Sequence, residues 1–212
     1  MFFQLAKTLF SKYAIHKKDK VYYIRDIEFY LYDDNHRDII TYPRNCAAGQ
    51  WFFHSSGVDL SFESYIEIGS RKDGTKIPSL SFSNTAFFGG ILIREIEPAD
   101  GVIESGRIRL DGPQKVVDEL YDQFDALYAP DNFPVLVEEE HHSEMDIEAI
   151  PRHNLLPSKP ELSHDQLVAE KVKTILSNYY GNGSELSESD VQTLEKDFET
   201  YRQAPYRFRV KQ

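Results

Sequence analysis

The chain has 212 residues, 41% hydrophobic and 13% aromatic, which predicts a packed core and excludes a globally disordered protein. Its formal net charge of −11 argues against a general nucleic-acid binder, because affinity for phosphate backbones comes from Lys and Arg. The single cysteine, Cys46, cannot form an internal disulfide, which favours a cytoplasmic location. No apolar run approaches the about 20 residues of a membrane span, so no membrane association is expected.

The N-terminal half reads as one helix followed by strands. Apolar residues between positions 2 and 10 recur at helical spacing and predict an amphipathic helix. Beyond residue 14, segments rich in β-branched and aromatic residues are separated by Gly, Pro, Asn and Asp, a pattern that predicts strands. These segments are VYYIRDIEFYLY (21–32), QWFFHSS (50–56), VDLSFESYIEI (58–68), SLSFS (79–83) and GGILIREIE (89–97).

The C-terminal half is mainly helical. Pro113 follows Gly112 at the start of a predicted helix whose apolar stripe is Val116, Val117, Leu120, Tyr121 and Phe124. FPVLVE (133–138) predicts a strand, and the proline-rich residues 151–162 predict an irregular connection. Ser163 and Ser187 are expected to cap two further helices, and PYRFRV (205–210) a final strand. The apolar stripes of the two helices fit packing on the body or, alternatively, a docking surface for a protein partner.

The fold class is therefore α+β, a single domain with a mainly antiparallel curved β-sheet and peripheral helices. Within 21–32, Asp26, Glu28 and Tyr30 share one strand face, which either meets water or lines a pocket. On GGILIREIE, alternation places Arg94 on one face between Leu92 and Ile96. A buried Arg needs a partner, and Glu28 is the natural one.

Two further patterns carry alternatives. In QWFFHSS, Trp51 and Phe53 point to one side, either into the core or as a stacking platform for a planar ligand. The adjacent His141 and His142 lack the spacing of metal ligands, so neither a metal nor another cofactor is expected.

Seven segments occur in the order of motifs found in the alkyladenine (3-methyladenine) DNA glycosylase family. They are RDIEFYLYDDNHRD, YPRN, QWFFHSSG, GGILIREIEP, DGPQKVVDEL, IPRHN and APYRF. The chain resembles that family from its N-terminal helix to Arg152 and again from Ala204. The resemblance implies a glycosylase-like core over 1–158, a two-helix insertion over 159–203 and a strand over 204–212 that returns to the core.

The resemblance also implies an activity, in which a monofunctional enzyme flips a damaged base out of DNA and hydrolyses its N-glycosidic bond. Glu28 falls at the family's general base, and Arg94 at the Arg that supports this carboxylate and the attacking water. Tyr30, His36 and Phe53 fall at the positions that sandwich the flipped base.

The expected contacts to DNA show departures from the family. Arg44, Asn45 and Arg152 are candidate DNA contacts, but Ser56 stands where the family has a tyrosine wedge that fills the gap in the duplex. Glu63 falls at the pocket Asn that discriminates between bases. Two functions are therefore predicted. One is excision of alkylated purines from DNA in base excision repair; the alternative is a nucleobase- or nucleoside-binding relative that does not engage duplex DNA.

Overall fold

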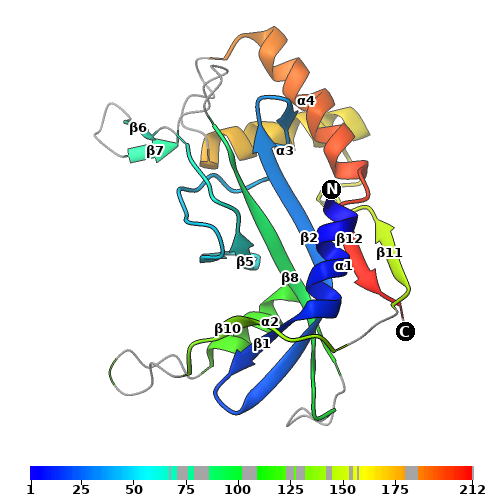
Figure 1. The fold of residues 1–212 in the computed structure, drawn as a ribbon. Coiled ribbons are helices and arrows are strands. Elements are labelled where there is room, and N and C mark those ends of the chain that lie inside the picture. Colours follow the sequence, from blue (N-terminus) through cyan, green and yellow to red (C-terminus); the bar gives the residue numbers. More distant parts are fainter. Residues whose placement is uncertain are drawn as a thin grey trace.

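The computed structural model describes residues 1–66, 68–70, 76–78, 86–101, 109–122, 127, 132–141, 145–152, 155–156, 158–179 and 186–211. The predicted strand at 79–83, together with Phe124 and His142, lies outside these residues. The described helices are α1 (Phe2–Lys12), α2 (Pro113–Tyr121), α3 (His164–Tyr179) and α4 (Glu188–Gln203) (Figure 1). None of them combines the length and the apolar character that a membrane span requires.

The strands form a curved antiparallel sheet and a separate hairpin. The main sheet has the strand order β10 (Val135–Glu138), β1 (Tyr13–Lys17), β2 (Lys20–Asp33), β8 (Phe88–Pro98), β5 (Gly57–Ser61) and β4 (Trp51–His54). It is extended by β3 (His36–Arg37), β9 (Leu110–Asp111), β11 (Ile147–Ile150) and β12 (Arg207–Val210). The hairpin pairs β6 (Ile68–Ser70) with β7 (Lys76–Pro78). The predicted α+β class and curved antiparallel sheet are confirmed.

Bulges in the two longest strands decide which residues face the core. The β2–β8 pairing shifts between Ile24 and Ile27, where Arg25 and Arg94 have no opposite residue. An extra residue in a strand reverses the alternation beyond it. Ile24 and Ile27 both reach the core although they are three residues apart, as do Ile93 and Ile96. The prediction that Ile96 shares a face with Arg94 was therefore wrong, because strict alternation does not anticipate a bulge.

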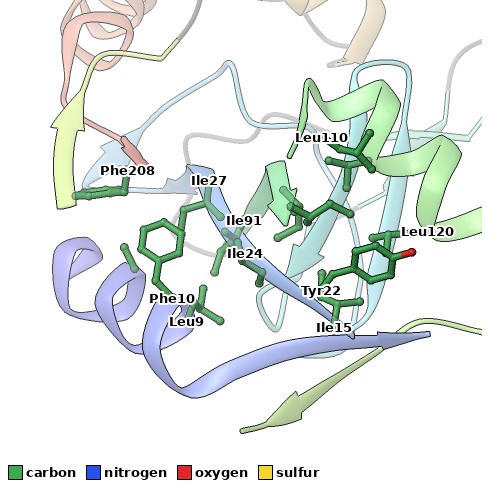
Figure 2. Packing of buried hydrophobic residues seen from close by; sticks show 14 of the residues in the cluster. Leu9, Phe10, Ile15, Tyr22, Ile24, Ile27, Ile91, Leu110, Leu120 and Phe208 are labelled. Atoms are coloured by element: carbon green, nitrogen blue, oxygen red, sulfur yellow. The ribbon is translucent and has the colours of Figure 1, made fainter. Parts of the chain in front are cut away.

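The main core lies where α1, α2 and β12 cover these strands. Figure 2 shows Leu9 and Phe10 of α1 and Leu120 of α2 near side chains of the sheet. The isoleucines of β2 and β8 and Phe208 of β12 belong to the same cluster. Its apolar surface fixes the long strands, on which the polar residues described below are carried.

A second core lies between the sheet and the two C-terminal helices, which lie together at one end of the long strands (Figure 1). Val172 of α3 and Phe198 of α4 are fully buried there with Tyr32 of β2 and Phe88 of β8. Both expected caps form: Ser187 makes a capping box with Asp190, and Ser163 exchanges hydrogen bonds with Gln166. The expectation that the apolar stripes pack on the body is confirmed.

Replacing Phe198 by Ala is expected to lower the free energy of unfolding by about 3–5 kcal/mol, because it empties a fully buried ring site. Urea denaturation followed by circular dichroism measures the change. Lys196→Ala, at an exposed position of the same helix, is the matched control and should stay within about 0.5 kcal/mol of the parent. A separate early transition of the helices, with the sheet unfolding unchanged, would contradict a shared core.

Candidate active site

Glu28 and Arg94 form an ion pair in the middle of the sheet. Glu28 is 1% exposed, and its Oε1 atom lies 3.2 Å from Nη1 of Arg94. Tyr30, two residues along β2, donates its hydroxyl hydrogen to Oε2 of Glu28 at 2.7 Å. Burial raises the pKa of Tyr30 well above its usual range, so the hydroxyl keeps the proton that it donates. The contact predicted between Glu28 and Arg94 is confirmed.

These three side chains line a pocket of about 240 Å³. Its other walls come from the loop after β3, from β4, β5 and β8, from the start of α2, and from α3. The remaining lining residues are Ile40, Tyr42, His54, Ser56, Asp59, Leu92, Pro113, Leu155, Lys171, Ile175 and Tyr179. The volume lies below the range of about 300–1,000 Å³ usual for pockets of drug-sized ligands, so the space suits a small molecule or a single base.

Asp59 supplies a second carboxylate on the same face of the sheet. It lies opposite Leu92 of β8, which itself lies opposite Glu28, so the two carboxylates stand two strands apart. Strands are spaced about 4.8 Å apart, which places the two backbones about 10 Å from each other. A pocket floored by Leu92 and bordered by two negative charges can accommodate a group that carries or develops positive charge.

Arg44 and His54 hold Asp59 in place. Arg44 Nη2 lies 2.6 Å from Oδ2 of Asp59, and His54 Nε2 lies 2.9 Å from Oδ1. The backbone N–H of Ser56 donates to Nδ1 of His54 at 3.2 Å, so Nε2 is the nitrogen that faces Asp59 as a donor. Gly90 makes this arrangement possible, since a Cβ atom there would lie 2.8 Å from Nη1 of Arg44 and 2.9 Å from a backbone oxygen.

Three residues expected to bind the base are not among those that line the pocket. Phe53 is 50% exposed and its ring packs against Tyr121 at 4.6 Å, because alternation on β4 sends it away from His54. Glu63 is exposed beyond the end of β5. His36 lies in an aromatic cluster, 4.1 Å between ring centroids from Tyr201. Tyr30 is the one member of the predicted base sandwich that the pocket includes.

Two of the four candidate DNA contacts are buried, contrary to what contact with DNA requires. Arg152 is 4% exposed, with Nη1 at 2.6 Å from Asp38 and Nη2 at 2.8 Å from the carbonyl oxygen of Tyr201. Arg44 is 3% exposed and paired with Asp59. Both guanidinium groups are buried and paired with buried carboxylates, so neither is exposed at the surface. Asn45 is exposed, but its Oδ1 accepts a hydrogen bond from the backbone N–H of Ile66 at 2.6 Å. Ser56 lies at the pocket.

Sequence reasoning missed Asp59 and the residues around the pocket entrance. His54 and Asp59 are each part of a predicted strand, and the pairing of β4 with β5 that joins them is visible only in the structure. Tyr42, Lys171 and Tyr179 gave no local signal, since Tyr42 comes from a loop and nothing in the sequence shows which part of α3 meets a pocket. In the sequence, the adjacent glycines Gly89 and Gly90 indicated that another group lies close to the backbone of this strand.

The described residues contain no group of three or more His, Cys, Asp or Glu side chains placed to hold a metal ion. His141 instead stacks on Tyr23, with ring centroids 4.1 Å apart. Comparison of the chain with protein-family models, with curated proteins and with solved structures finds no significant match. The resemblance to the alkyladenine DNA glycosylases therefore stays a prediction.

The pH dependence of stability can test whether the ring of His36 is buried in the aromatic cluster. Burial lowers the pKa of His36, and its Nε2 atom has no hydrogen-bond partner within the described part of the chain. As pH falls through about 6.5, the unfolded chain takes up a proton that the folded state resists, so the stability provided by the neutral ring is lost below that pH. The slope for one such group is at most about 1.4 kcal/mol per pH unit.

His36→Phe is thus expected to lose less stability than the parent protein between about pH 7 and about pH 5. Urea denaturation at both pH values measures the difference. Lys196→Ala, at an exposed position of α4, is the control and should follow the parent. Equal acid sensitivity of His36→Phe and the parent would show that the ring can be protonated in the folded state.

Proposed function

We propose that the pocket around Glu28 hydrolyses the N-glycosidic bond of an alkylated purine. The observation that carries the proposal is a buried carboxylate, held by Arg94 and Tyr30, that lines a pocket of the size of a base. A general base must lie within hydrogen-bond reach of the proton that it removes, and Glu28 meets this condition for a water molecule in the pocket.

The reaction follows from the chemistry of the substrate. Glu28 accepts a proton from water while the water oxygen bonds to the sugar carbon, and the carbon–nitrogen bond breaks with its electron pair left on the base. A purine alkylated on a ring nitrogen, as in 3-methyladenine, is positively charged before cleavage and leaves as a neutral base, so its departure needs no proton from an acid. The transition state resembles an oxocarbenium ion, whose positive charge the Asp59 carboxylate can stabilise across the pocket.

The base itself would be held by aromatic side chains. Tyr30, Tyr42 and Tyr179 line the pocket, and the ring of Tyr42 packs 4.5 Å from that of His54. Stacking on such rings contributes about 1–3 kcal/mol per base. Tyr42 and Tyr179 thereby take the role that the family resemblance gave to His36 and Phe53.

In its full form the proposal is a DNA repair glycosylase that excises 3-methyladenine-type bases in base excision repair. The resemblance of seven ordered motifs supports this choice of substrate. A cytoplasmic location, favoured by the lone Cys46, belongs to the same proposal.

Glu28→Gln is expected to reduce base release from methylated DNA by about 10²–10⁴-fold, the usual contribution of a general base. Single-turnover release of free base, separated by chromatography, measures the rate. Glu63→Gln, which removes an exposed carboxylate outside the pocket, is the matched control and should keep the parent rate. Circular dichroism must show that Glu28→Gln stays folded, because Arg94 loses its counter-charge. Equal release by the parent and Glu28→Gln would rule out this mechanism.

A second candidate is a nucleobase- or nucleoside-binding protein that does not engage duplex DNA. It is supported by Ser56 at the wedge position, by the burial of Arg44 and Arg152, and by the net charge of −11. Duplex DNA with an abasic-site analogue is then expected not to bind at micromolar concentration. Binding that weakens steeply with salt in a titration would contradict this candidate, because loss of affinity with salt is the signature of phosphate contacts.

A further inference from the structure

Helix α3 forms one wall of the pocket. Its residues Lys171, Ile175 and Tyr179 line the cavity that contains Glu28, while Val172 and Leu176 of the same helix are buried in the second core. The wall is therefore fixed by packing rather than laid loosely across the opening. A ligand in this pocket therefore contacts side chains of α3 as well as side chains of the sheet.

Two arginines at or beside the pocket are each paired with a carboxylate, and a lysine lies there as well. Arg94 is paired with Glu28, and Arg44 is paired with Asp59. Lys171 lines the pocket too, yet within the described part of the chain its ammonium group has no carboxylate partner. Lys171 thus adds a positive charge at one part of the pocket, away from the two carboxylates, where it can bind an anionic group of a ligand.

Hydroxyl groups lie at the same side of the pocket as Lys171. The Tyr42 hydroxyl lies 3.5 Å from that of Ser55 and 3.4 Å from that of Ser56, and its ring meets that of Tyr179 on α3. Burial opposes ionisation of Tyr42, but hydrogen bonds with Ser55, Ser56 and Tyr179 outweigh it and lower the pKa of Tyr42. Ser55 and Ser56 are exposed and Lys171 is half-buried, whereas Glu28 and Asp59 are buried. The hydroxyls and the ammonium group therefore surround the mouth, and the carboxylates form the floor.

We propose that the pocket takes a purine mononucleotide, with its phosphate at Lys171 and the hydroxyls of the mouth and its glycosidic bond above Glu28. This inference rests on the hydrolysis proposed for Glu28, and it takes a free mononucleotide in place of duplex DNA as the substrate. An ammonium group and several hydroxyls provide the hydrogen-bond donors that a phosphate needs. A duplex would require further cations around the mouth, and the two arginines expected there are buried.

The test compares adenosine with adenosine 5′-monophosphate in isothermal titration calorimetry. Neither is alkylated, so the base is a poor leaving group and binding can be measured without turnover. The parent protein is expected to bind the monophosphate about tenfold more tightly than the nucleoside, the factor that one charge-assisted contact provides. Lys171→Gln should abolish that preference. Lys173→Gln removes the same charge from an exposed position of the same helix and should retain it.

Equal affinity for the two ligands, an unchanged preference in Lys171→Gln, or tighter binding of an alkylated duplex with no effect of Lys171→Gln would each overturn the inference. These outcomes are separable from failure of the proposed hydrolysis. Base release that depends on Glu28 without any preference for the monophosphate would leave the hydrolase and remove the phosphate site. A preference for the monophosphate that depends on Lys171, without base release, would leave the phosphate site and remove the hydrolase.

Discussion

Glu28 lies in the interior of the sheet, where an isolated carboxylate would lose several kcal/mol of hydration. It is tolerated there because Nη1 of Arg94 lies 3.2 Å away and the Tyr30 hydroxyl donates at 2.7 Å. The bulge that leaves Arg94 without an opposite residue on β2 turns its side chain toward Glu28 and keeps Ile93 and Ile96 in the core. This one bulge therefore places residues both in the apolar core and on the polar floor of the pocket. Removing either Glu28 or Arg94 would leave the charge of the other uncompensated.

The same arrangement recurs across the protein and limits what its surface can do. Asp26, Asp38 and Asp59 are each at most 1% exposed, and they pair with Arg207, Arg152 and Arg44, respectively. Arginine suits these pairings because its planar guanidinium group can bond two oxygens at once. Arg44 and Arg152 are buried by this pairing, at 3% and 4% exposure, and Arg207 is partly buried. Burying carboxylates in this way therefore reduces the number of arginines that the surface can present.

Local patterns predicted the elements well, and the site in part. Ser163 and Ser187 identified the starts of α3 and α4 because a capping box needs only residues three apart. The pair of Glu28 and Arg94 was foreseen because each stood out in an apolar strand. The bulge was not foreseen, since the two-residue alternation of side chains does not indicate where the pairing of two strands shifts its register. Asp59 was missed because its significance depends on the neighbouring strands, and Phe53 was misplaced because a motif match does not determine which face of β4 meets the pocket.

Helix α3 shows how stability and specificity can arise from one element. Its apolar stripe, including Val172 and Leu176, attaches the helix to Tyr32 and Phe88, and burial of such side chains contributes about 1.5–3 kcal/mol each. Fixing that stripe also fixes the backbone positions of Lys171 and Tyr179, whose side chains line the pocket. A flexible loop could have carried the same two residues, but ordering it around a ligand would cost conformational entropy at each binding event. Packing the helices during folding removes that cost, so the pocket has its α3 wall before any ligand arrives.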